Sequence, residues 1–210
     1  MTGKYIVFDG IDGGGKSLQL EMLHQHLYPK ENVFKTQEPN FLSPTELVIR
    51  QKLKLGLNSL TQEQFDLQMI HLFFANRIDH FYGVGNIANR IDHGYHILSD
   101  RGTLSTVAYN GNSEENLDLI YQLAKGFPQP DYTFYFDLPV EVAMERLRQR
   151  GGGDSFEKEE NLRRVQANYA AAIARMIDEG KAVFIIDANK PVEEVHKSII
   201  TLMKRIVLRS

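Results

Sequence analysis

Five short apolar runs alternate along the chain with longer segments in which apolar residues recur at helical spacing. The runs cover residues 5–8, 33–36, 97–99, 133–137 and 183–186. Their length and nearly continuous apolar character predict strands that are buried on both faces. Helices are predicted between and after these runs, at residues 18–27, 43–55, 62–82, 114–126, 140–150, 157–179 and 192–208. The alternation predicts an α/β fold, with five parallel strands in a doubly wound sheet flanked by helices.

The chain shows no internal boundary. No linker rich in proline, glycine or serine divides it, so residues 1–210 are predicted to form a single domain. A hydrophobic fraction of 42% at this length is sufficient for a substantial core. The net charge of −3 provides no broad basic field, so we expect no nucleic acid polymer as a partner.

The composition also limits which chemistry the protein can perform and where in the cell we expect it. The sequence contains no cysteine, which excludes disulfides, thiolate nucleophiles and zinc sites built on sulfur. The apolar run near residue 5 is too short for a signal peptide, and no stretch approaches the length of a membrane span. We therefore expect a cytoplasmic protein that does not bind membranes.

A glycine-rich segment follows the first predicted strand and opens the first predicted helix. Residues 10–17 read GIDGGGKS and fit the phosphate-loop pattern G-x-x-x-x-G-K-[ST]. Backbone N–H groups of such a loop surround phosphates, and the helix N-terminus adds positive charge. Lys16 is expected at the β- and γ-phosphates of ATP and Ser17 at Mg²⁺, although an ordinary glycine-rich turn is the alternative. The predicted ATP-binding residues are Gly10, Ile11, Asp12, Gly13, Gly14, Gly15, Lys16, Ser17 and Leu18.

The third predicted strand is followed by a carboxylate, Asp100. Phosphate-loop proteins hold Mg²⁺ or its water ligands with an acid at this position, so Asp100 and Ser17 are the predicted metal ligands. The alternative is that Asp100 caps the next helix, because aspartate is a favoured N-cap residue.

A nucleotide site alone is compatible with a switch, a motor or a transferase. A GTP switch requires N-K-x-D, and the nearest segment, NKPV at residues 189–192, has a valine that cannot bind guanine. Phosphoryl transfer requires cations near the donor and acceptor phosphates, for which arginine is well suited. Three candidates for this role are Arg50 on the predicted helix after Glu38-Pro39, Arg77 in the segment HLFFANR, and Arg101 directly after Asp100.

Three further arginines precede a glycine triplet at residues 151–153. By helical spacing, Arg146 and Arg150 fall on one face of the predicted helix and Arg148 on another. We predict a short arginine-rich lid over residues 146–160 that closes over ATP, with the glycines as its hinge. Considered alone, such a cluster is more often a solvated helix face.

Taken together, these motifs resemble thymidylate kinase. The matching segments are F-D-G-x-D-G-G-G-K-S, the E-P pair at residues 38–39, F-x-x-N-R at 73–77, D-R-x-x-x-S-x-x-A-Y at 100–109, P-D-x-x-x-x-x-D at 130–137 and the lid. They are colinear over residues 4–187. The resemblance implies a three-layer P-loop kinase fold and transfer of the ATP γ-phosphate to dTMP, giving dTDP and ADP for dTTP synthesis. It also implies a homodimer formed through the helices around residues 61–82.

The resemblance assigns roles to individual residues. Phe73, rather than Phe74, matches the aromatic residue that stacks on thymine, and Arg77 matches the arginine that binds a thymine carbonyl. Considered alone, Phe73 reads as core packing and Tyr109 as an ordinary half-buried tyrosine. The implied acceptor-binding residues are Asp12, Glu38, Arg50, Phe73, Arg77, Arg101, Ser105, Tyr109 and Asn110. The implied catalytic residues are Lys16, Asp9, Arg101, Arg150 and Arg146, and residues 187–191 are expected at the adenine.

The pattern departs from the family at Gln37, at Asn40-Phe41-Leu42, at Gly102 and at residues 154–157. These positions surround the expected acceptor and lid, so they bear on the base that is accepted more than on the reaction class. Two alternatives follow. One is a kinase for another deoxynucleotide or a deoxynucleoside, and the other is a nucleotide-binding protein without catalysis.

Overall fold

The computed structural model describes residues 2–28, 30–151 and 156–206. Five parallel strands form one sheet in the order β2-β3-β1-β4-β5. The strands are β1 (Tyr5–Asp9), β2 (Val33–Gln37), β3 (His96–Asp100), β4 (Tyr132–Asp137) and β5 (Val183–Asp187). The helices are α1 (Lys16–Leu27), α2 (Thr45–Leu55), α3 (Gln62–Phe81), α4 (Ile87–Asp92), α5 (Thr103–Asn110), α6 (Glu114–Ala124), α7 (Val140–Gln149), α8 (Phe156–Asp178) and α9 (Val192–Ile206). The predicted α/β fold with a five-stranded parallel sheet is confirmed.

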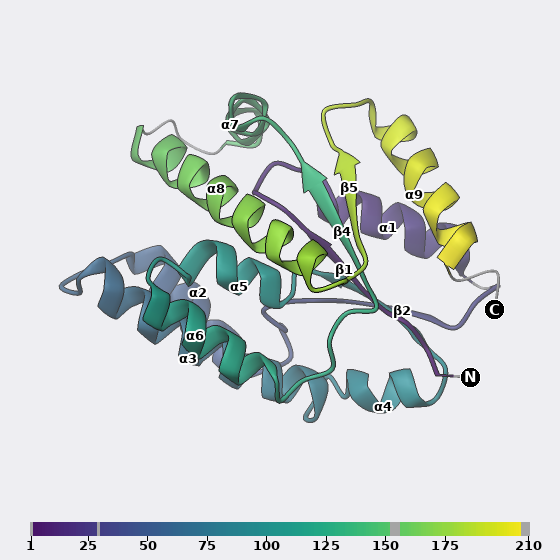
Figure 1. Ribbon diagram of the computed structural model, residues 1–210, viewed down its shortest axis with the longest axis horizontal. Coiled ribbons are helices and arrows are strands. Elements are labelled where there is room, and N and C mark those ends of the chain that lie inside the picture. Colours follow the sequence, from purple (N-terminus) through teal and green to yellow (C-terminus); the bar gives the residue numbers. More distant parts are fainter. Residues whose placement is uncertain (1, 29, 152–155, 207–210) are drawn as a thin grey trace.

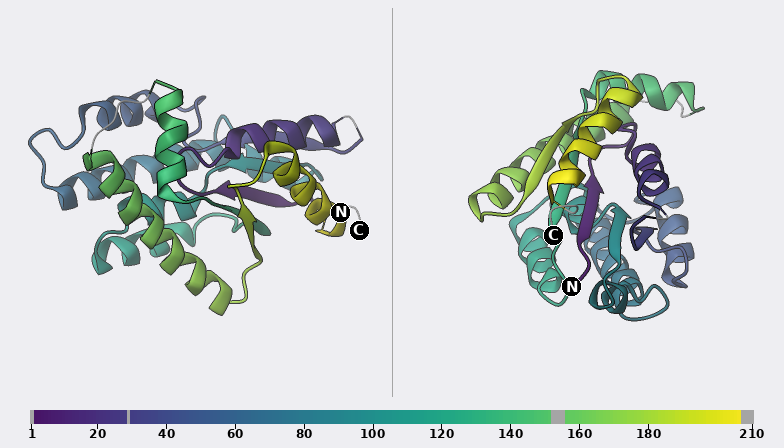
Figure 2. Two further views of the ribbon diagram at one scale, coloured as in Figure 1. Left: turned by 90° about the horizontal axis from the view of Figure 1, so that it is seen from above. Right: turned by 90° about the vertical axis from the view of Figure 1, so that its right-hand side faces the viewer.

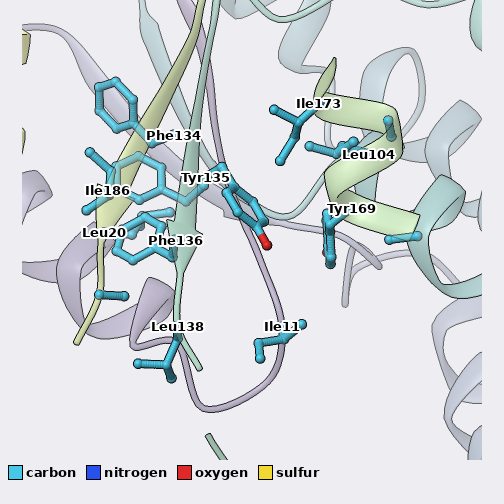
Figure 3. Close-up of a cluster of buried hydrophobic side chains, with 14 of the residues drawn as sticks. Ile11, Leu20, Leu104, Phe134, Tyr135, Phe136, Leu138, Tyr169, Ile173 and Ile186 are labelled. Carbon is cyan, nitrogen blue, oxygen red and sulfur yellow. The ribbon is translucent and has the colours of Figure 1, made fainter. Parts of the chain in front are cut away.

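Helices cover both faces of the sheet. Figure 1 shows α1 and α9 on one face and α3, α5, α6 and α8 on the other, and Figure 2 shows α1 and α9 side by side. Successive residues of a strand point to opposite faces. On β4, Phe134 and Phe136 therefore lie on the side of α1, whereas Tyr135 points to Tyr169 of α8 (Figure 3). The result is a three-layer arrangement with the core on both sides of the sheet.

The parallel register brings the carboxyl ends of the strands to one edge. Phe8 of β1 pairs with Asp100 of β3, and Asp137 of β4 pairs with Asp187 of β5. The loops that leave these ends carry the glycine-rich segment and the other predicted site residues. In open parallel sheets, ligands bind at this edge.

Two helices were not predicted, α4 and α5. α5 contains Thr103, Thr106 and Val107, whose branched side chains lower helix propensity. It forms because Leu104, Val107 and Ala108 are buried against the core, so packing outweighs local preference. By contrast, α3 begins at a capping box between Thr61 and Gln64, which fixes its predicted start.

Candidate active site

The glycine-rich segment forms a tight loop between β1 and α1. Gly10 and Gly13 have φ angles of 140° and 87°, which residues with a side chain rarely adopt. A Cβ atom at Gly13 would also lie 2.9 Å from the carbonyl oxygen of Ala143 in α7. The loop therefore needs glycine for its own conformation and for the close approach of α7.

Lys16 lies under this loop. It is 6% exposed, and its Nζ donates a hydrogen bond to the carbonyl oxygen of Ile11 over 2.8 Å. Burial, with a contribution from the neighbouring Arg101, lowers the pKa of Lys16 to about 8. A cavity of about 150 Å³ lies over the loop, lined by Asp12, Gly13, Gly15, Lys16, Ser17, Leu18, Asp100, Arg101 and Arg150.

The two predicted metal ligands face each other. The hydroxyl of Ser17 donates to Oδ2 of Asp100, so the end of β3 and the start of α1 meet at this point. Among the described residues, no group of three or more acidic, histidine or cysteine side chains is arranged to hold a metal. A hydroxyl and one carboxylate fit Mg²⁺ that takes its other ligands from phosphates and water.

Arg101 joins the loop to the other side of the site. Its Nη2 donates to Oδ1 of Asp12 over 2.6 Å, and its Nη1 donates to the hydroxyl oxygen of Ser105 over 2.8 Å. The φ angle of Arg101 is 74°, held by a hydrogen bond from its N–H to the carbonyl oxygen of Phe8. A non-glycine residue in this region is strained, and such strain is concentrated at functional sites.

A buried polar cluster lies below the loop. Oδ1 of Asp9 accepts hydrogen bonds from the hydroxyls of Ser105 and Tyr169, each over 2.6 Å. Burial raises the pKa of Asp9, although Arg101 and the two hydroxyls act in the opposite direction. Tyr169 was not predicted as a site residue. Its place seven residues after Leu162 on the buried face of α8 predicts only core packing.

A larger cavity of about 610 Å³ opens beside the loop. Eight of the nine predicted acceptor-binding residues line it, namely Asp12, Glu38, Arg50, Phe73, Arg101, Ser105, Tyr109 and Asn110. Phe73 faces this cavity, whereas Phe74 is buried in the core. The exposed Arg50 is paired with Glu46 one helical turn before it.

Several lining residues were not predicted. They include Thr106, which follows Ser105 in the unpredicted helix α5, and Arg164 in the first half of α8. Asp66 also lines the cavity and accepts a hydrogen bond from Nδ2 of Asn112 over 2.6 Å. Because Asp66 precedes Phe73 by seven residues, helical spacing could have placed both on one face of α3.

Arg77 is the predicted acceptor-binding residue that does not line the cavity. Its guanidinium is 2% exposed and binds Glu38 through Nε (3.1 and 3.0 Å) and Nη2 (2.5 Å). Nη2 also donates to Thr106 over 3.2 Å, and both Glu38 and Thr106 do line the cavity. Burial opposes ionisation of Glu38, but Arg77 and His80 hold its pKa down to about 2. The predicted contact of Arg77 with a thymine carbonyl stays a prediction.

The arginines of the predicted lid differ in their surroundings. Arg146 donates from Nη1 to the carbonyl oxygen of Gly13 over 3.2 Å and from Nη2 to that of Ala188 over 3.0 Å. α7 ends at Gln149, one residue earlier than predicted, so Arg150 follows the helix and is exposed at the smaller cavity. Residues 152–155, which include two of the three predicted hinge glycines, lie outside the described residues.

Comparison with known proteins identifies the family. A family model for thymidylate kinase matches residues 8–199. The chain belongs to the thymidylate kinase family. A "Probable thymidylate kinase" of Pyrobaculum aerophilum is 33% identical over 97% of this chain and 97% of the relative. A "Probable thymidylate kinase" of Methanosarcina mazei is 32% identical over 100% and 99% of the two chains, and a "Thymidylate kinase" of Cupriavidus metallidurans is 31% identical over 95% and 96%.

Membership of the thymidylate kinase family confirms the predicted resemblance and the class of enzyme, an ATP-dependent kinase of nucleoside monophosphates. The relatives match over nearly their whole length, so the similarity is not limited to the phosphate loop. In the part of the chain that the structure describes, no helix has the length and apolar character needed to cross a membrane.

Proposed function

We propose that this chain transfers the γ-phosphate of ATP to dTMP at the point where the two cavities meet. Asp12 and Arg101 line both the smaller cavity over the phosphate loop and the larger one beside it. A donor in the first cavity and an acceptor in the second would therefore approach each other at these two side chains. The position of Asp12 and Arg101 in both cavities is the main support for the proposed transfer.

On the donor side, residues 10–18 bind the phosphates of ATP, and residues 187–191 lie against the adenine. Lys16 exchanges the carbonyl oxygen of Ile11 for β- and γ-phosphate oxygens. Arg146 supports this arrangement because it binds backbone carbonyls of both the phosphate loop and Ala188. Ser17 and Asp100 would hold Mg²⁺, which when bound neutralises charge on the β- and γ-phosphates.

On the acceptor side, Arg50 and Arg101 bind the phosphate of dTMP, and Phe73 stacks on the base. Asn110 is buried at the cavity, and its Oδ1 has no hydrogen-bond partner among the described residues. This oxygen can accept the N–H of a pyrimidine, while Arg77 and Ser105 bind near the same edge. Tyr109 packs against the sugar, and Asp12 accepts the 3′-hydroxyl.

The transfer is a direct in-line displacement. An oxygen of the dTMP phosphate attacks the γ-phosphorus, and the bond from that phosphorus to the bridging oxygen breaks, leaving its electron pair on ADP. The protein contributes positioning and positive charge, with Lys16, Arg101 and Arg150 nearest the transferred group and Arg146 in support. Asp9 holds Ser105 in place and thereby orients the acceptor.

The test is an ADP-release assay with ATP and Mg²⁺ against dTMP, dUMP, dCMP, dGMP, UMP and thymidine. Preferred turnover of dTMP is expected. Preference for another acceptor would keep the kinase but reassign specificity to the altered positions Gln37 and Gly102. Binding of ATP without turnover of any acceptor would overturn the proposal.

The whole chain is proposed to act as one kinase domain, with residues 146–160 as its lid, in the cytoplasm. Its proposed assembly is a homodimer through α3. Leu67 and Ile78 are 43% and 55% exposed and lie on one side of this helix by their 11-residue spacing. Exposed apolar side chains that share a face favour association. Sedimentation velocity should give a dimer for the wild type and a monomer for Ile78→Asp.

A further inference from the structure

His80 lies on α3, next to Glu38 of the larger cavity, and is completely buried, with 0% of its surface exposed. Its two ring nitrogens have different partners. Nδ1 is 3.3 Å from Oε1 of Glu38, and Nε2 is 2.7 Å from the hydroxyl oxygen of Thr36. The phosphoryl-transfer chemistry described above does not use this histidine.

These partners determine where the ring carries its proton. A carboxylate can only accept a hydrogen bond, so Nδ1 must be protonated and donate to Glu38. The hydroxyl of Thr36 can donate to Nε2, so both ring nitrogens have a hydrogen-bond partner. His80 thus presents one fixed donor to Glu38.

Glu38 in turn determines the position of Arg77. The carboxylate binds Nε and Nη2 of the guanidinium, and Thr106 binds Nη2 from another side. Nη1 of Arg77 is buried and has no partner among the described residues. A buried donor without an acceptor is unfavourable, and a carbonyl oxygen of the base would satisfy it.

We propose that His80 is a positioning residue for acceptor recognition: by donating from Nδ1 to Glu38, it holds the Glu38–Arg77 pair so that Nη1 of Arg77 meets a base carbonyl. This inference rests on the proposed binding of dTMP. His80 touches neither nucleotide and contributes to the affinity and the choice of the base, not to the transfer of the phosphoryl group.

Two amide substitutions of His80 distinguish the roles of its two ring nitrogens. The amide nitrogen of asparagine can take the place of Nδ1, whereas the longer glutamine reaches the position of Nε2 and leaves Glu38 without its donor. We expect His80→Gln to raise KM for dTMP about tenfold, the effect of one lost hydrogen bond to a charged group, with kcat and KM for ATP nearly unchanged. His80→Asn should restore most of the affinity. dCMP has an amino group in place of one carbonyl of dTMP. The ratio of kcat/KM for dTMP to that for dCMP should fall in His80→Gln and largely recover in His80→Asn.

Thermal unfolding of both variants and of the exposed control His93→Gln shows how much of any change is loss of folded protein. A purely structural role would lower kcat through the folded fraction, leave KM for dTMP unchanged and make Asn no better than Gln; that outcome overturns the inference. The variant Arg77→Lys distinguishes a failure of this inference from a failure of the proposed function. If KM for dTMP does not respond to Arg77→Lys, the base contact itself is wrong, whereas a response to Arg77→Lys without one to His80→Gln refutes only the role of His80.

Discussion

The guanidinium of Arg101 lies 2.6 Å from the carboxylate of Asp12 and borders both the smaller cavity over the phosphate loop and the larger cavity beside it. Although partial burial opposes ionisation of Asp12, the positive charge of Arg101 holds its pKa below the ordinary value. The pair thus presents one cation and one anion at the same point. An acceptor that carries a phosphate and a sugar hydroxyl provides the complementary charges and hydrogen bonds.

The backbone of Arg101 gives a prediction about stability. Because its φ angle of 74° suits glycine, Arg101→Gly should be more stable than Arg101→Ala by about 0.5–1 kcal/mol. Both variants should lack measurable turnover. At Arg50, within the ordinary helix α2, the order should reverse, with glycine about 1 kcal/mol less stable than alanine. Urea unfolding of the four variants provides the comparison, and the same order at both positions would exclude strain at Arg101.

The buried position of Lys16 predicts a pH-dependent affinity for ATP. Free enzyme loses the Lys16 proton near pH 8, whereas bound phosphate favours the charged amine, so ATP binding above pH 8 takes up a proton. Affinity should therefore fall as pH rises from about 8 to 9.5, by up to tenfold per pH unit. Calorimetric titration in buffers of different ionisation enthalpy measures both effects. Lys16→Arg, which stays charged, should bind more weakly but without this pH dependence; a constant affinity for the wild type would contradict the pKa.

Alanine substitutions of the two adjacent residues Phe73 and Phe74 should affect different properties of the protein. Phe73→Ala should raise KM for dTMP by the loss of a stacking contact worth roughly 1–3 kcal/mol, with little change in stability. Phe74→Ala should instead destabilise the fold by about 3–5 kcal/mol, because Phe74 is buried in the core. Steady-state kinetics and denaturant unfolding of both variants test this. Equal losses of stability would mean that Phe73 is a core residue too.

Glu38 should contribute a share of stability that acid removes. Its folded-state pKa of about 2 lies below its ordinary value of 4.5, so the stabilisation is complete above pH 4.5 and is lost as pH falls toward 2. At neutral pH, Glu38→Gln should lower the free energy of unfolding by on the order of 3 kcal/mol. The difference from the wild type should shrink between pH 4.5 and 2.5. Glu21→Gln, which removes an exposed pair with Lys35, should show little difference at any pH.

The arginines around the end of α7 allow a matched comparison. Arg150 is exposed at the smaller cavity, whereas the exposed Arg148 binds Glu145 on its own helix. Arg150→Ala should therefore lower kcat about 10²-fold with a smaller change in KM, and Arg148→Ala should leave kcat within about twofold. Single-turnover measurements would assign the loss to the transfer step. An unchanged kcat for Arg150→Ala would remove Arg150 from the chemistry.

The parts of this protein that could be predicted from sequence depend on short-range patterns. The phosphate loop lies within eight residues whose glycines and lysine have few other uses, and the start of α3 is set by a cap four residues long. Apolar periodicity was sufficient for the sheet and for most helices. The choice of Phe73 over Phe74 needed the family pattern, because two neighbouring apolar residues are equivalent to a periodicity argument.

The remaining parts depend on contacts between distant segments. Tyr169 reaches Asp9 across 160 residues of sequence, and α5 forms because the core buries one side of it. The sequence alone gives no reason to assign a role to His80, since an isolated histidine in an apolar helix has many possible partners. Only the fold brings it to Glu38, 42 positions earlier.

The bond between Lys16 and the carbonyl oxygen of Ile11 has a consequence for ligand discrimination. In the proposed complex with ATP, the ammonium exchanges one acceptor for another, so the number of its hydrogen bonds need not increase. The gain in binding free energy comes instead from replacing a neutral acceptor oxygen with an anionic one, because a hydrogen bond between two charged groups is stronger. A nucleoside or a monophosphate at the donor site has no β- or γ-oxygen to offer in this exchange. We therefore expect short donors to bind weakly, because the backbone of the loop competes with them for Lys16.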